Sequence, residues 1–186
     1  MSAPNVPVFQ TLDNLLTAYQ GENNASIKYM GFALKAEIDG FLRLASLFRA
    51  VARGEQVHAV HHARVITKLG GTPHAAIHPC EIKGTRENLE SVKAGEEYVS
   101  QVMYPKFIKE AEASGQEDAV RVFTLVLKAE IAHARLDEEA LANLDAQRIQ
   151  TTFYVCLSCG EVTDDAAEAE HCPLCHSPKQ QFDTLR

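Results

Sequence analysis

The stretch "VFTLVLKAEIAHARL", residues 122–136, is the most informative part of this sequence for predicting its fold. Its apolar residues recur every three or four positions, which is typical of a helix with one face toward a protein core. Glu130 and His133 lie on that same face, because residues three apart on a helix point the same way. A carboxylate and an imidazole facing a core need a partner that offsets the cost of their burial. The stretch therefore predicts a core helix with chemically active groups on its inner face.

Three other stretches show the same helical period. Core-facing stripes run from Leu12 to Tyr29, from Phe41 to Leu69 and from Leu89 to Phe107, and the opening stretch belongs to a fourth, from Val120 to Leu141. The second and third stripes are joined by a longer connection with two prolines, residues 70–84, whereas the other connections are short. Two short turns and one long crossover predict a mainly α protein, a four-helix bundle of the ferritin-like type.

The polar residues on these stripes form an internal repeat. In each half of the bundle a lone glutamate precedes a Glu-x-x-His pair by 33 or 34 residues, and a tyrosine follows the lone glutamate after seven or eight. The members of the repeat are Glu22, Tyr29, Glu55 and His58 in the first half and Glu96, Tyr104, Glu130 and His133 in the second.

Four carboxylates at one level of a bundle core predict a metal site. Bare ionised carboxylates there would cost several kcal/mol each and would repel one another. Two divalent cations balance the four negative charges, and each histidine adds one neutral nitrogen. One Glu from each of two helices and a Glu-x-x-His from the other two is a pattern already described for di-iron and di-manganese carboxylate proteins. Mixed carboxylate and imidazole ligation suits redox-active iron.

Four of the five cysteines lie in the last 31 residues, as two CxxC pairs. They are Cys156, Cys159, Cys172 and Cys175. In a reducing compartment such pairs predict a metal site rather than disulfides. Tetrahedral ligation by four cysteines accommodates either zinc or iron, and spacing alone favours a structural zinc site. Fusion to a di-iron bundle, which needs an electron source, favours iron. The fifth cysteine, Cys80, is expected to be a partly buried, inert thiol in the long connection.

Composition limits the possible partners and location. The chain has 186 residues, enough for one full core and a small appendage, with the bundle expected at residues 1–148 and the cysteine module at 149–186. A net charge of −7 argues against a nucleic-acid partner. No apolar run approaches the ~20 residues of a membrane span. The N-terminal "MSAPNVPVFQ" lacks a secretory pattern, so a cytoplasmic protein is expected.

Over essentially its whole length the sequence resembles the rubrerythrins. The resemblance is carried by "GENNASIKY" (21–29), "GEQVHAVHH" (54–62), "AGEEYVSQVMYP" (94–105) and "VFTLVLKAEIAH" (122–133), then by "YVCLSCG" (154–160) and "HCPLCHSPK" (171–179). It implies a non-haem di-iron centre at the six helix-borne ligands and a rubredoxin-like iron centre at the four cysteines. The implied activity is reduction of hydrogen peroxide to water in oxidative stress defence, with electrons from NADH through a separate reductase or rubredoxin. The implied assembly is a homodimer in which the rubredoxin-like iron serves the partner chain.

One position departs from the family pattern. Rubrerythrins commonly carry a further glutamate three residues after the one that aligns with Glu96, and here that residue is Val99. Glu97 is a poor substitute, because one step along a helix turns a side chain by about 100°. In the family the extra carboxylate ligates one iron in the oxidised state and the histidine aligned with His58 takes its place on reduction. We therefore expect His58 to stay bound in both states. We also expect the di-iron site to have a higher reduction potential than a site with the extra glutamate.

Several alternatives remain open from the sequence. The six-ligand set also resembles oxygen-activating centres, so O2 is a second candidate oxidant, and a non-catalytic iron-binding or electron-transfer protein is a third hypothesis. Tyr29 and Tyr104 either hydrogen-bond to glutamate ligands or simply pack in the bundle. Asp137 could orient an imidazole but is expected to be a surface charge. The remaining histidines are left out of the site: His61, His62, His74, His78, His171 and His176.

Overall fold

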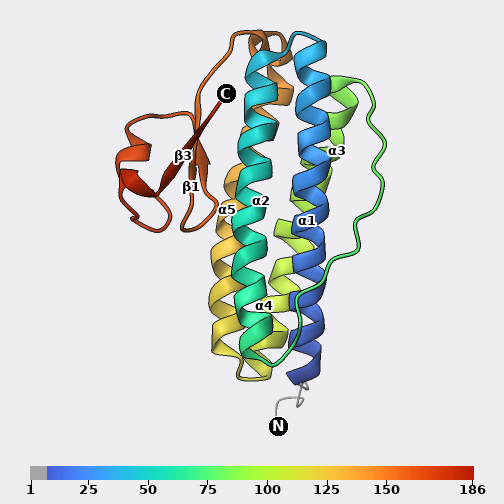
Figure 1. Cartoon of the computed structure of the whole chain (residues 1–186), viewed down its shortest axis with the longest axis vertical. Coiled ribbons are helices and arrows are strands. Elements are labelled where there is room, and N and C mark those ends of the chain that lie inside the picture. Colours follow the sequence, from blue (N-terminus) through green and yellow to red (C-terminus); the bar gives the residue numbers. More distant parts are fainter. Residues whose placement is uncertain (1–7) are drawn as a thin grey trace.

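The computed structural model describes residues 8–186, so residues 1–7, part of the stretch considered for a secretory signal, lie outside the described part. Four long members lie side by side in a bundle, and the long connection makes the second and third of them run in the same direction (Figure 1). Three of them are the helices α1 (Val8–Ile38), α2 (Leu42–Lys68) and α5 (Glu117–Ala142). The remaining member consists of α3 (Thr85–Tyr98), a π-helical segment (Val99–Met103) and α4 (Tyr104–Ala113). The ferritin-like bundle expected from the helical stripes is confirmed.

The π-helical segment is a departure from the regular third helix that the periodicity predicts. The backbone N–H of Tyr104 donates to the carbonyl oxygen of Val99, five residues earlier. A π turn takes up one more residue than an α turn without ending the helix. This explains why Tyr104 follows Glu96 by eight residues while Tyr29 follows its own glutamate by seven. Both tyrosines still reach the inside of the bundle, where each is buried.

The C-terminal residues form a small unit beside α2 and α5 (Figure 1). After a 3-10 turn (Leu144–Arg148) come the strands β1 (Phe153–Cys156), β2 (Val162–Thr163) and β3 (Phe182–Leu185). They form an antiparallel sheet in the order β2-β1-β3, with two short 3-10 turns at Glu168–Glu170 and Lys179–Gln181. The boundary expected after residue 148 precedes β1 and stays a prediction.

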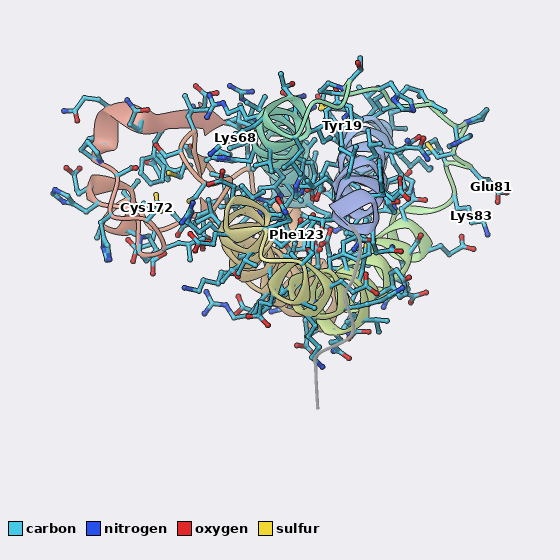
Figure 2. The ribbon with its side chains drawn as sticks, turned by 90° about the horizontal axis from the view of Figure 1, so that it is seen from below. Tyr19, Lys68, Glu81, Lys83, Phe123 and Cys172 are labelled. Atoms are coloured by element: carbon cyan, nitrogen blue, oxygen red, sulfur yellow. The ribbon has the colours of Figure 1, made fainter. Side chains whose placement is uncertain are left out.

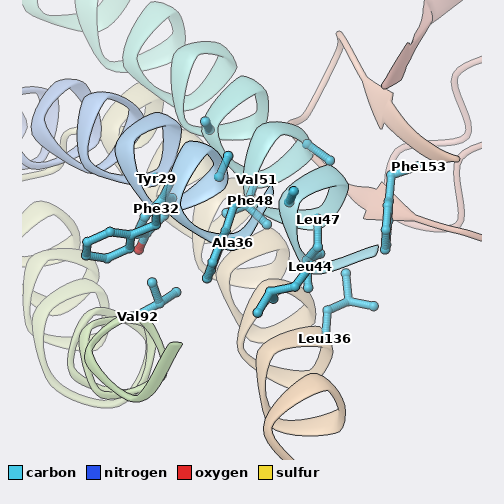
Figure 3. Close-up of a cluster of buried hydrophobic side chains, with 14 of the residues drawn as sticks. Tyr29, Phe32, Ala36, Leu44, Leu47, Phe48, Val51, Val92, Leu136 and Phe153 are labelled. Atoms are coloured by element: carbon cyan, nitrogen blue, oxygen red, sulfur yellow. The ribbon is translucent and has the colours of Figure 1, made fainter. Parts of the chain in front are cut away.

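Two apolar clusters form the core, one toward each end of the bundle. One is centred on Phe107, Phe123 and Ile66. The other contains Phe48 and extends to Phe153 of β1, which packs against α2 and so joins the small unit to the bundle (Figure 3). The predicted site lies between these clusters. Within the described residues, no helix is long and apolar enough to cross a membrane.

Candidate metal centres

The structure brings together all six helix-borne residues of the repeat. They form two overlapping groups, in each of which the potential ligand atoms lie within 4.8 Å of one another. The groups are Glu22, Glu55, His58 and Glu130, and Glu55, Glu96, Glu130 and His133. All six side chains are buried. Because Glu55 and Glu130 belong to both groups, the arrangement fits two metal ions that share these two carboxylates.

The two histidines each turn one ring nitrogen toward the carboxylates. Nδ1 of His58 lies 3.0 Å from Glu130 Oε1 and 3.1 Å from Glu55 Oε2. Its Nε2 lies 3.2 Å from the carbonyl oxygen of Cys159, and Nε2 of His133 lies 3.1 Å from that of Gly160. A carbonyl oxygen only accepts, so Nε2 carries the hydrogen and the lone pair of a neutral ring sits on Nδ1. In the neutral ring, both Nδ1 atoms are therefore available to bind a metal ion.

The negative charges of the buried carboxylates favour the binding of cations at the cluster. Burial and the nearby charges of Glu55 and Glu130 raise the pKa of Glu22 and Glu96 well above the usual carboxyl value. Burial alone would lower the pKa of His58, but Glu130 and Glu55 outweigh it and raise that pKa to about 9. The metal-free protein thus takes up protons where divalent ions would otherwise balance the carboxylates. Buried atoms without a hydrogen-bond partner, His133 Nδ1 and Glu130 Oε2, also fit metal ligation.

Both repeat tyrosines contact glutamates of the cluster. The Tyr29 hydroxyl donates to Glu96 Oε1 at 2.5 Å, and the Tyr104 hydroxyl donates to Glu22 Oε1. Burial, together with the charge of the glutamate, raises the pKa of each phenol well above its usual value, so both stay protonated. Of the two alternatives left open for these residues, the geometry favours hydrogen bonding to the glutamates over packing alone.

His62, which the sequence interpretation left out, belongs to this network. Its Nε2 lies 2.9 Å from the Tyr104 hydroxyl, which already donates to Glu22, so the His62 ring donates to the phenol oxygen. Burial lowers the pKa of His62 to about 3, which keeps the ring neutral. The signal was present in the sequence, because His62 follows His58 by one helical turn on the same core-facing stripe.

Two other expectations were wrong. Asp137 is fully buried rather than a surface charge, and its carboxylate has no hydrogen-bond partner among the described residues. Burial raises the pKa of Asp137 to about 8. Asp137 is the repeat counterpart of His62, since each follows a cluster histidine by four residues. Cys80 is exposed rather than partly buried.

The four clustered cysteines form the second candidate centre. Their sulfurs lie within 4.8 Å of one another, with Cys156 and Cys175 3.6 Å apart and Cys159 and Cys172 3.5 Å apart. A disulfide needs about 2.05 Å, whereas the edge of a tetrahedron with metal–sulfur bonds of about 2.3 Å is close to 3.8 Å. The neighbouring thiols lower the pKa of Cys156 to about 4 and raise that of Cys159. The prediction of a four-cysteine metal site over disulfides fits this geometry.

The cysteine module is docked on the di-metal site of its own chain. Carbonyl oxygens of the knuckle residues Ser158, Cys159 and Gly160 accept hydrogen bonds from His61, His58 and His133, respectively. The backbone of the knuckle lies close to the backbone of α2, because a Cβ at Gly54 of α2 would lie 2.7 Å from the Gly160 carbonyl oxygen.

Two ion pairs flank the docked knuckle. Arg43 pairs with Asp164 at 2.7 Å and Arg53 with Asp183 at 2.8 Å. These contacts are made within one chain, and the expectation that the cysteine centre serves a partner chain stays a prediction.

Comparisons with known proteins agree with this architecture. The rubrerythrin family model matches residues 13–141. A nigerythrin from Nitratidesulfovibrio vulgaris is 35% identical over 94% of this chain and 86% of its own length, and a rubrerythrin from the same organism is 32% identical over 95% and 94%. A solved structure of mixed-valence nigerythrin superposes with a TM-score of 0.86 at 33% identity, covering 94% of this chain and 86% of that one.

A more distant likeness concerns the fold alone. A Desulfovibrio desulfuricans bacterioferritin has a TM-score of 0.68 at 22% identity, covering 75% of this chain and 82% of the other.

Together with the two residue clusters, the full-length relatives confirm the cofactor types expected from the sequence, a non-haem di-iron centre and a rubredoxin-type iron centre. The chain belongs to the rubrerythrin family.

Proposed function

We propose that this protein is a peroxidase that reduces hydrogen peroxide to water at its di-iron site, in defence against oxidative stress. We propose the six clustered carboxylates and imidazoles as the di-iron ligands and the four cysteines as the ligands of an electron-relay iron. When bound, the paired irons supply the electrons and Lewis acidity for breaking the O–O bond, and the cysteine-bound iron supplies replacement electrons one at a time.

The observation that carries this proposal is the pair of histidine–carbonyl hydrogen bonds between the two centres. His58 and His133 face the carboxylates through Nδ1 and hold the backbone of Cys159 and Gly160 through Nε2. Cys159 is itself one of the four clustered cysteines. A storage protein has no need of a redox module fixed against its metal site, whereas a reductase of peroxide must receive electrons there.

The side chains around the cluster have separable roles. Tyr29 and Tyr104 keep their phenolic hydrogens and orient Glu96 and Glu22, which fixes which oxygen of each carboxylate faces the cluster. His62 holds Tyr104 in that position. Burial of all these groups places their hydrogen bonds in a low-dielectric environment, which strengthens each interaction.

The supporting partners are also proposals. Electrons are supplied by an NADH-dependent reductase or a rubredoxin that meets the exposed side of the cysteine module. A homodimer and a cytoplasmic location remain predictions. The docked knuckle supports an electron path within a single chain.

Oxygen is the second candidate oxidant, and Val99 is the residue that favours it. The apolar side chain borders the cavity over the cluster at the position where rubrerythrins commonly carry another carboxylate. The same replacement supports the expectation that His58 remains bound in both redox states, because Val99 supplies no carboxylate to take its place and the carbonyl oxygen of Cys159 restrains the ring.

The deciding experiment is stopped-flow reoxidation of the fully reduced protein with H2O2 and with O2, followed by steady-state turnover with NADH and a reductase. Peroxidase function predicts faster reoxidation by H2O2 and sustained turnover. A rate with O2 equal to or above that with peroxide would favour the oxidase alternative. A single stoichiometric burst without turnover would favour a non-catalytic iron protein. Elemental analysis should find iron at both centres, and zinc at the cysteines would remove the internal relay.

A further inference from the structure

A cavity of about 350 Å³ opens directly onto the carboxylates of the di-metal site. It lies between α1 and α3, and residues 78–80 of the long connection form part of its rim. Its floor consists of Glu22, Glu55, Glu96 and Glu130. The long connection and the cysteine module lie on opposite sides of the bundle, as Glu81, Lys83 and Cys172 show in Figure 2. The cavity and the electron-relay module therefore approach the cluster from different directions.

The walls of the cavity are mainly apolar. Ala25 and Tyr29 of α1 face Val99 and Met103 of the π-helical segment, and Pro79 adds an apolar surface at the rim. Lys28 is the only lysine or arginine among the lining residues in the described part of the chain. Hydrogen peroxide is small and entirely polar, so it gains little from such walls, whereas an apolar substituent would be desolvated there.

Two glycines inside helices keep the cavity open. Gly21 and Gly95 both line it, and each directly precedes a lone glutamate of the repeat. A Cβ built on either residue meets no atom within 4 Å. Glycine is unfavourable inside a helix relative to alanine, and here no close packing requires it. Space beside the glutamates is thus retained in both halves of the repeat.

The volume of the cavity exceeds what hydrogen peroxide needs. One water molecule takes a share of about 30 Å³ in the liquid, so 350 Å³ would hold on the order of ten waters. Pockets for small organic ligands begin at about 300 Å³. A carboxylate at position 99 would bring charge into this space, whereas Val99 leaves the wall apolar.

We propose that this cavity binds organic hydroperoxides with a small apolar substituent, such as tert-butyl hydroperoxide, and presents their O–O bond to the carboxylate floor. The inference rests on the proposed peroxidase function and names a second substrate class for the same site. The hydroperoxide ROOH takes two electrons, delivered singly through the cysteine-bound centre from the external reductase, and two protons from solvent. The O–O bond breaks, and the products are the alcohol ROH and one water.

The test compares two valine-to-phenylalanine variants of the iron-loaded protein. Val99→Phe fills the cavity, whereas the control Val102→Phe changes an exposed residue of the same π-helical segment that does not line it. For wild type and Val102→Phe we expect turnover of both tert-butyl hydroperoxide and H2O2. For Val99→Phe the ratio of kcat/KM for the organic hydroperoxide to kcat/KM for H2O2 should fall about tenfold or more. Gly95→Leu, which enters the cavity from another wall, should lower the same ratio.

A binding measurement separates this inference from the proposed function. Calorimetric titration of the metal-free protein with tert-butanol, the product alcohol, should show binding to wild type and Val102→Phe and loss of binding in Val99→Phe. Turnover of H2O2 without turnover of the organic hydroperoxide would overturn the inference and leave the proposed function standing. If neither peroxide is turned over, the proposed function fails. Equal alcohol binding by both phenylalanine variants would also overturn the cavity assignment.

Discussion

Nε2 of His58 lies 3.2 Å from the backbone carbonyl oxygen of Cys159, so one hydrogen bond joins a residue of the carboxylate cluster to a residue of the cysteine cluster. The two residues are 101 positions apart in the chain. Next to this contact, Gly160 has a backbone φ of +86°, and its carbonyl oxygen accepts from His133. We expect electron transfer between the two centres to depend on this docking, and Gly160, the glycine that permits it, can be changed.

Gly160→Ala should separate the two centres. A Cβ at this position would overlap the His58 ring, and the left-handed φ adds a strain of about 1–2 kcal/mol. We expect transfer of electrons from the cysteine centre to the di-iron site to slow at least tenfold, while the absorption spectrum of the cysteine centre is preserved. Gly115→Ala is the matched control, because Gly115 has a φ of +67° but open space around it. Equal transfer rates in both variants would show that docking is not required.

Removing the Tyr29 hydroxyl should weaken metal binding. In Tyr29→Phe, Glu96 loses the hydrogen bond that orients it, and groups that support metal ligands typically contribute 10–100-fold in affinity. Tyr98→Phe removes a hydroxyl from a residue that is 57% exposed and serves as the control. Competition titrations of Co²⁺ against a chelator measure the difference. If Tyr29 only packs in the bundle, both variants should bind Co²⁺ as tightly as wild type.

Without its metal ions, the folded protein should become less stable as pH rises. Burial and neighbouring charges raise the pKa of Glu22 and Glu96 in the folded metal-free protein, so the folded state holds protons that the unfolded chain releases above about pH 4.5. Stability is therefore lost as pH rises from that value through the raised pKa. Bound Mn²⁺ reverses this trend, because its ligands must be deprotonated. The gap in Tm between the Mn²⁺-loaded and chelated proteins should be wider at pH 8 than at pH 5.5, and a constant gap would contradict the assignment.

Asp137→Asn should stabilise the metal-free protein in a pH-dependent way. The folded pKa is about 8 and the unfolded value about 3.9. Between pH 4 and pH 8 the carboxyl ionises in the unfolded chain but stays protonated in the folded one, which lowers stability increasingly as pH rises. Guanidinium unfolding should give similar stabilities at pH 4 and a gain for the variant of up to ~4 kcal/mol at pH 7. Glu138→Gln, at an exposed neighbour, should show no such gain. A variant that is less stable than wild type at pH 7 would show that the Asp137 carboxylate has an ionic partner.

The bundle and the membership of both residue clusters could be predicted from the amino-acid sequence alone. Helical period is a local property, so the stripe through Glu130 and His133 sets their common face before any tertiary contact forms. The duplicated spacing then pairs each lone glutamate with a Glu-x-x-His motif, and charge balance requires cations. The four-cysteine site could also be predicted from the sequence, because two short CxxC segments identify the four sulfurs that come together.

The contacts between elements that are distant in the chain could not be predicted from the sequence and are seen in the folded structure. Burial of Asp137 and the hydrogen bond of His62 to Tyr104 depend on which helix faces which. The helical stripe places His62 toward the core but does not identify its partner. The π turn at Val99 depends on keeping Tyr104 in register with Glu22. Docking of Cys159 on His58 in the same chain depends on side-chain and backbone fit across an interface, including two glycines, and no local period encodes that fit.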